Sequence, residues 1–293
     1  MSANEQIHQN HIKTSFGRKV FVFFNIIILT LVCLTIAIPL WNVLITSVAK
    51  DEDVMGKVYL LWPRSFTLKT YAKVLKSGYM LAFKNSSFVA VTATALSMLL
   101  TVPMGFALAQ KNLVFRNFFM TLVVGTMIFD AGMIPFYVLV KNLHLIDSFA
   151  ALIIPVAIST FNVIIVKNFM ASLPESLMES AKLDGCTEVG IFWRIALPLS
   201  VPILAAVLLF YFVQHWNRYF EVVMFINNSR KYTLQVVLRT LMFESESTIT
   251  GGDAVYDNLK MTIMLMGMLP VLILYPFVQK YFVSGLMVGS IKG

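Results

Sequence analysis

The sequence predicts an all-α protein that crosses a membrane several times. Of its 293 residues, 58% are hydrophobic and only 13% are charged, and the mean hydropathy is +0.78. A soluble domain carries about a quarter charged residues, so the excess of apolar side chains indicates that lipid surrounds much of the chain. The charged residues also separate long apolar intervals, each close to or above the about 20 residues that a helix needs to cross the hydrocarbon layer.

Six apolar intervals predict six transmembrane helices. We expect spans near residues 20–48, 85–109, 118–140, 149–169, 197–220 and 260–282. Open strands would leave backbone groups unpaired in lipid, and the alternating pattern of a membrane barrel is absent. The spans define one transmembrane domain, 20–282, between tails at 1–19 and 283–293. The first interval exceeds the about 7–15 apolar residues of a signal peptide, so we interpret it as an uncleaved span.

The distribution of basic residues predicts that both termini are cytoplasmic. Six spans place both ends of the chain on one side, and basic residues in the first tail and the short second connection favour the cytoplasm for these segments. These residues are Lys13, Arg18, Lys19, Lys111 and Arg116. Segment 49–84 is also basic and would lie outside, but a segment of this length can be translocated despite its charges. Segment 171–196 would then face the cytoplasm.

The net charge of +8 and the pI near 9.4 fit a protein of the inner membrane. The basic residues are scattered, without a stripe or a base-stacking module, so contact with anionic lipid head groups explains them better than nucleic acid does. Cys33 lies in an apolar interval and Cys186 in a polar one, so they form no disulfide framework. His8 and His11 belong to a solvated tail, and no metal site is expected.

Segment 171–196 predicts two short helices joined by a glycine bend. Ser172 and Glu175 have the spacing of a capping box, and Pro174 suits a first helical turn. Gly185 would end the first helix, because glycine readily takes a left-handed conformation, and Thr187 can cap the second. Leu173, Leu177 and Ala181 share one face of the first helix; the second carries Ile191, Phe192 and Ile195.

This segment resembles the EAA loop of ABC importer permeases. The resemblance rests on Glu179-Ser180-Ala181, Asp184-Gly185 and Ile195-Ala196-Leu197-Pro198, with Ser180 in place of the family's usual second alanine. It implies that the loop inserts into a cleft of an ATPase subunit and transmits the closure of the ATPase dimer to the spans. The residues implied in this coupling are Glu179, Ala181, Asp184, Gly185, Ile195, Leu197 and Pro198.

Two further stretches resemble the carbohydrate-type permeases of this family. Residues 281–293 are similar to their tail, and residues 129–135 with 143–145 are similar to the branch that imports oligosaccharides from complex polysaccharides. The resemblance implies an oligosaccharide importer, closest to those for alginate and pectin fragments. The basic external segments favour an acidic sugar, because a positive potential enriches anions.

The resemblance also implies the partners. It predicts a second permease subunit in a heterodimer, an extracytoplasmic solute-binding protein and two ATPase subunits that bind ATP and Mg. The chain lacks G-x-x-x-x-G-K-[ST], H-E-x-x-H and G-x-S-x-G. We therefore expect a transport subunit without a cofactor of its own, not an enzyme.

Asp130 and residues 214–217 are the candidates for the substrate pathway. Asp130 is the acid within the third interval; it lines the pathway, or it lies near a helix end and satisfies the local backbone. Gln214, His215, Trp216 and Asn217 offer hydrogen bonds and flat rings, which a sugar needs, although an aromatic belt at the membrane interface has the same composition.

Two other functions remain open from the residues alone. An ion-driven secondary transporter could use Asp130 as a proton relay. A membrane-embedded enzyme could use His215 and Asp130 as acid–base groups.

Overall fold

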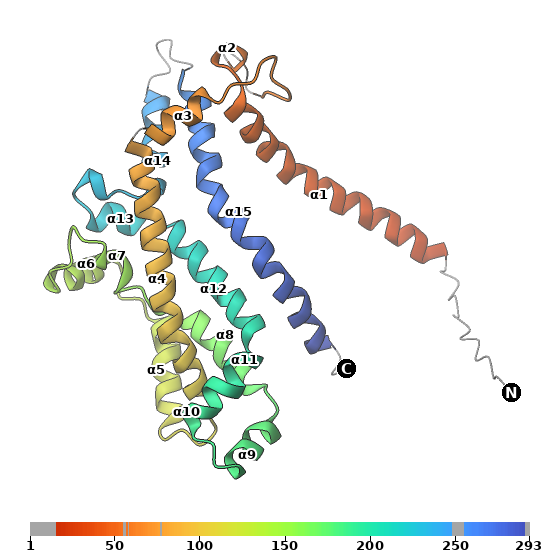
Figure 1. Cartoon of the computed structure of the whole chain (residues 1–293), viewed down its shortest axis with the longest axis vertical. Helices are drawn as coiled ribbons and strands as arrows, with labels where there is room; N and C mark the ends of the chain where they lie inside the picture. Colours follow the sequence, from red (N-terminus) through yellow and green to blue (C-terminus); the bar gives the residue numbers. More distant parts are fainter. Residues whose placement is uncertain (1–15, 55–56, 58, 77, 248–254, 291–293) are drawn as a thin grey trace.

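The computed structural model describes residues 16–54, 57, 59–76, 78–247 and 255–290, and this part of the chain is built from helices (Figure 1). An isolated bridge joins Ala49 to Phe66, and the described residues contain no longer strand pairing. The helices are α1 (Phe16–Val48), α2 (Asp51–Val54), α3 (Lys69–Lys76), α4 (Gly78–Ala109), α5 (Arg116–Ile128), α6 (Met133–Asn142), α7 (Ala150–Ile153), α8 (Thr160–Ala171), α9 (Glu175–Leu183), α10 (Glu188–Ile191), α11 (Leu197–Leu199), α12 (Val201–Trp216), α13 (Phe220–Phe225), α14 (Leu234–Ser247) and α15 (Val255–Ser290). A π-helical turn, Phe192–Ala196, joins α10 to α11, and a 3₁₀ turn, Ser229–Lys231, precedes α14.

Three helices of the described chain, α1, α4 and α15, are each long and apolar enough to cross a membrane. Two bent pairs could add two more: α5 with α6, at 114°, and Glu188–Leu199 with α12, at 80°. The structure therefore supports a multi-pass helical protein with up to five spans by this criterion. The count of six and the cytoplasmic location of the termini stay predictions.

The third and fourth expected spans differ from the structure, which breaks both. In 118–140, α5 ends at Ile128 and α6 begins at Met133, after Gly132 with φ +80°. In 149–169, α7 ends at Ile153, two residues before Pro155. Pro155 lacks the backbone donor and restricts the residue before it, which favours a break at this position. Proline alone does not impose one, because α4 continues through Pro103.

The other expected boundaries shift by several residues. α1 begins at Phe16, α4 begins at Gly78 instead of 85, and the fifth interval is divided at Ser200 and after Trp216. α15 extends from Val255 to Ser290, so the helix runs into the expected C-terminal tail. Residues 1–15, which hold most of the expected N-terminal tail with His8 and His11, lie outside the described residues.

The centre of the molecule is formed by α4, which packs against α8 and α12. Gly105 allows the closest approach: a Cβ there would lie 2.6 Å from Val166 Cγ1 on α8. The Tyr211 hydroxyl on α12 contacts Thr101 Oγ1 on α4 at 2.6 Å and accepts a hydrogen bond from the Ser159 N–H at 3.0 Å. One buried side chain thus fixes the α7–α8 break against two long helices.

Helix α1 leaves this bundle and extends away from it, as Figure 1 shows in red. It contacts α15, but within it only Ile45, Thr46 and Ser47 are buried. Its apolar residues therefore need lipid or another protein around them.

Candidate functional site

The turn between α9 and α10 is a Schellman motif centred on Gly185. Gly185 has φ +80°, a conformation that glycine adopts without a Cβ penalty. Its N–H donates to the Lys182 carbonyl at 3.0 Å, and the Cys186 N–H donates to the Ala181 carbonyl at 2.9 Å. These two bonds satisfy the last carbonyls of α9 and set the angle between the helices. The glycine bend predicted from the sequence is confirmed.

The second short helix has the predicted cap, whereas the first does not. Thr187 Oγ1 accepts a hydrogen bond from the Gly190 N–H at 3.2 Å. The expected capping box of Ser172 and Glu175 is wrong: Ser172 ends α8 and its hydroxyl donates to the Phe169 carbonyl at 2.7 Å. Pro174 is the N-cap residue of α9 and makes no side-chain cap, so α9 begins one residue later than expected.

The base of this loop is part of the hydrophobic core. Ile191, Phe192 and Ala196 are buried in one cluster with residues of α4 and α8. The Phe192 ring lies 5.1 Å from the Phe106 ring of α4, measured between centroids. A force on the loop therefore reaches α4 and α8 through close-packed side chains, which deform little.

The tip of the loop exposes large apolar side chains. Leu183 is 89% exposed and Val189 66%, and Trp193, in the π-helical turn at the base of the loop, is 61% exposed. No residue of α9 is buried in the chain by itself. Exposed apolar side chains of this kind are typical of surfaces that other proteins cover. We call Leu183 and Val189 the loop tip.

The faces of α9 differ in part from the expectation. Ala181 is half-buried, as is Met178 beside it, but Leu177 points away from the core and is exposed. The inner face is therefore set by Met178 and Ala181. The sequence analysis missed the loop tip because a helical pattern identifies an apolar face without telling whether this chain or a partner covers it.

The remaining residues of the EAA-like motif line the loop in different ways. Glu179, Asp184, Gly185 and Pro198 are exposed, whereas Ile195 and Leu197 are half-buried. Glu179 also borders a cavity of about 300 Å³ between α9 and residues 109–112, and in the described chain it forms no ion pair. Lys111 closes one side of this cavity with an exposed ion pair to Glu175 at 2.6 Å.

The structure divides the residues expected along the pathway. His215 and Trp216 are buried: His215 Nε2 lies 3.1 Å from Ser97 Oγ, and Trp216 Nε1 donates to the Gly267 carbonyl at 2.9 Å. Both therefore hold α12 against neighbouring helices. Gln214 and Asn217 are exposed, and the Asn217 Oδ1 accepts a hydrogen bond from Gln235 Nε2 at 3.3 Å.

Asp130 lies in the break between α5 and α6. Its Oδ1 accepts a hydrogen bond from the Gly132 N–H at 3.0 Å, and the residue is exposed. This geometry matches the local-backbone alternative for Asp130. Within the described residues, no group of three or more His, Cys, Asp or Glu side chains is placed to hold a metal ion.

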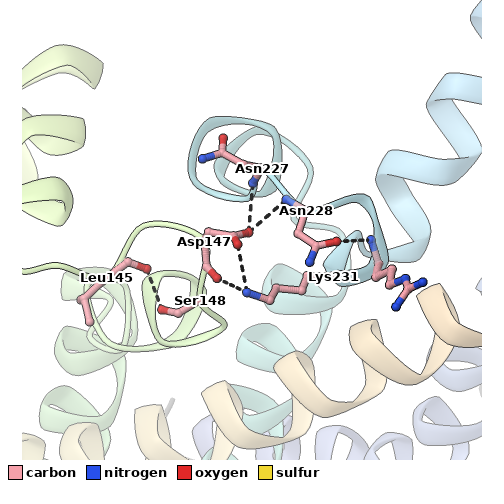
Figure 2. A network of polar contacts seen from close by, with 7 residues as sticks. Leu145, Asp147, Ser148, Asn227, Asn228 and Lys231 are labelled. Atoms are coloured by element: carbon pink, nitrogen blue, oxygen red, sulfur yellow. Dashed lines mark hydrogen bonds and ion pairs between the residues drawn. The ribbon is translucent and has the colours of Figure 1, made fainter.

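A second polar network, which the sequence analysis missed, joins the α6–α7 connection to the α13–α14 connection (Figure 2). Asp147 Oδ1 accepts hydrogen bonds from the N–H groups of Asn227, at 3.2 Å, and Asn228, at 3.0 Å. Its Oδ2 pairs with Lys231 Nζ at 3.1 Å, and its N–H donates to the Phe225 carbonyl at 2.8 Å. The Asn228 N–H and Lys231 lower the pKa of Asp147 below its usual value. The residues are 80 positions apart, a distance that no local pattern bridges.

Comparison with known proteins places this architecture in a family. Residues 101–288, more than half of the chain, match the model of the binding-protein-dependent transport system inner membrane component. The chain belongs to this family. It is therefore an inner-membrane permease subunit of an ABC importer, a multi-pass transport protein and not an enzyme. Permease subunits of such importers carry no cofactor themselves and work with further components of the transport system.

Several characterised proteins are similar to the permease over nearly its whole length. Protein LplC of Bacillus subtilis is 40% identical, and the alignment covers 98% of this chain and 99% of that protein. The polygalacturonan/rhamnogalacturonan transport system permease protein YtcP of the same organism is 39% identical, covering 93% and 97%. A chain in the crystal structure of a bacterial ABC transporter involved in the import of the acidic polysaccharide alginate has a TM-score of 0.83 and 27% identity, covering 92% of the permease and 99% of that chain.

Proposed function

We propose that the permease couples to its ATPase subunits through the α9–α10 loop. The observation that supports this most strongly is the contrast within the loop. Its tip exposes Leu183 and Val189, while its base is buried among α4 and α8. An apolar tip needs a protein cleft, and a rigid base converts movement of that cleft into movement of helices.

The expected partners complete the transport cycle. Two ATPase subunits would bind ATP and Mg and close on each other, and each would carry one permease loop with it. A second, distinct permease subunit would supply the rest of the pathway, forming a heterodimer, and an external solute-binding protein would deliver the cargo. The two states of the pathway must differ in their contacts with nucleotide or cargo, since only such differences shift the equilibrium between them.

We propose an acidic oligosaccharide as the cargo. Two similar proteins, YtcP and the alginate transporter, have names that refer to acidic polysaccharides or their fragments. The basic segment 49–84, which we expect to lie outside, agrees with this, because a positive potential concentrates anions near the mouth of a pathway.

The bend at Gly185 provides the test of coupling. A Cβ at Gly185 would meet nothing within 4 Å, but the φ of +80° is unfavourable for valine. In proteoliposomes containing the complete importer, Gly185→Val should abolish the ATPase activity stimulated by the loaded binding protein. Gly125→Ala is the matched control, since Gly125 is equally open but has an ordinary helical backbone. Wild-type stimulation in Gly185→Val would refute the proposed coupling.

A further inference from the structure

A cavity of about 500 Å³ lies between α12, α14 and α15, with Val43 of α1 at its wall, away from the α9–α10 loop. Its volume falls within the about 300–1,000 Å³ of ligand sites. Its polar side chains are Asn217, Gln235 and Arg239. The apolar part of its wall includes Leu238, Met264, Met268 and Leu272. We call it the α12–α15 cavity.

Arg239 is held in place by an aromatic ring. Its guanidinium carbon lies 4.3 Å from the centroid of the Tyr219 ring, a cation–π contact. Tyr219 is half-buried against the core cluster around Phe225, so its ring is a fixed platform. Stacking uses one face of the guanidinium and leaves its N–H edge free to donate.

The charge of Arg239 is open to a ligand. Of the carboxylates whose side chains the structure describes, none pairs with Arg239. Arg239 is exposed, so solvent and solutes reach it. A planar guanidinium with a free edge matches the geometry of a carboxylate, to which it can donate two parallel hydrogen bonds.

The other walls suit the rest of a sugar ring. The Gln235–Asn217 hydrogen bond fixes both amides and leaves the Asn217 NH₂ and the Gln235 carbonyl for hydroxyl groups. The apolar wall can pack against C–H faces. Trp216 also lines the cavity. Its indole N–H already donates to the Gly267 carbonyl, so its ring contributes to the shape of the cavity and not to hydrogen bonding with a ligand.

We propose that the α12–α15 cavity binds one uronic-acid residue of the cargo, with Arg239 receiving the carboxylate and Asn217 and Gln235 receiving hydroxyl groups. This inference rests on the proposed function and adds a site to it. A neutral sugar would gain only the amide and apolar contacts. Arg239 would thus make the permease itself selective for acidic residues, independently of the binding protein.

The test compares trigalacturonate with its methyl ester, in which the carboxylates are neutral. Import by the complete importer in proteoliposomes is measured for wild type, Arg239→Gln, Arg239→Lys and the control Arg64→Gln, which removes an equal charge from an exposed arginine outside the cavity. All complexes receive the same binding protein. Its own preference for acid or ester therefore cancels when the import measured for each variant is divided by that of wild type.

We expect Arg239→Gln to raise the trigalacturonate concentration that gives half-maximal import about tenfold, because one charge-assisted hydrogen-bonded pair is lost. The corresponding concentration for the methyl ester should not change. For Arg239→Lys the half-maximal trigalacturonate concentration should lie between those of wild type and Arg239→Gln, since lysine keeps the charge but lacks the planar guanidinium that donates two parallel hydrogen bonds. Arg64→Gln should behave as wild type.

Two other results would decide against the site in different ways. Equal effects of Arg239→Gln on acid and ester, or effects no larger than those of Arg64→Gln, would overturn the site while leaving the importer function intact. A wild-type importer that hydrolyses ATP but imports neither trigalacturonate nor a mannuronate trimer would refute the acidic cargo, and the site with it.

Discussion

Asp147 illustrates how much single polar residues matter outside the spans. It has φ +58°, uncommon for a residue other than glycine, and its carboxylate and N–H hold the α13–α14 connection through four partners (Figure 2). An unfavourable backbone persists only where surrounding contacts fix it. The carboxylate is therefore expected to stabilise the junction in its ionised form.

Stability should fall at low pH in a way that depends on Asp147. Its folded pKa is lower than the unfolded value near 3.8, so its contribution is complete above that value and is lost as the pH falls through it toward the folded pKa. Asp147→Asn should lower the melting temperature of the detergent-solubilised complex at pH 6 and flatten its fall below about pH 4. Asp130→Asn is the control, because the side-chain hydrogen bond that Asp130 makes within the described residues is to the nearby Gly132 N–H. Identical melting curves for Asp147→Asn and wild type across this range would count against the junction.

Residue types alone identified some of these roles and not others. Gly185 and Thr187 could be predicted because a bend and a cap depend on neighbouring residues. The burial of His215 and Trp216 could not, since it depends on α4 and α15, more than fifty positions away. Polar aromatic residues have the same composition whether they contact a sugar or a neighbouring helix.

At the scale of elements, the contact of α4 with α8 determines how the loop is held. A Cβ at Gly105 would lie 2.6 Å from Val166 Cγ1 and 3.2 Å from the Lys167 backbone nitrogen. The second atom cannot move aside as a side chain can. The two helices therefore depend on a glycine at this crossing.

Gly105→Ala should destabilise the permease by about 1–3 kcal/mol through overpacking. Gly125→Ala lies in a helix with open space and should be neutral or stabilising by about 0.5–1 kcal/mol, because alanine is the better helix former. Thermal unfolding of both variants in detergent measures the difference. An equal gain in both would mean that α4 and α8 are farther apart than the structure places them.

The sequence predicted that these segments are apolar helices, but it did not predict where the helices are interrupted. An interval without charges records that a segment is apolar and does not record whether its helix is broken. Gly132 and Pro155 were the available signals for the two breaks, and the bond from Ser159 to the Tyr211 hydroxyl satisfies backbone that the second break leaves unpaired. That bond joins residues distant in the sequence, so only the structure reveals it.

At the scale of the whole molecule, much apolar surface is left for lipid or other proteins to cover. Helix α1 is almost entirely exposed, and the loop tip presents two large apolar side chains. The loop lies at the opposite end of the bundle from α3 (Figure 1). The EAA-like motif and the missing P-loop predicted a subunit that depends on partners. The proposed coupling adds the loop tip as the ATPase contact, and the buried base of the loop connects it to α4 and α8.

The central claim is that the loop tip docks into an ATPase subunit, and the most direct test is the affinity of the purified permease complex for that subunit. Leu183→Glu with Val189→Glu would place two charges on the docking surface. Since burying each apolar side chain contributes about 1.5–3 kcal/mol, the dissociation constant should rise more than tenfold. The control is Leu61→Glu, which changes a leucine between α2 and α3 that is 73% exposed. A tenfold loss confined to the loop variant is predicted; unchanged affinity in that variant would contradict the account.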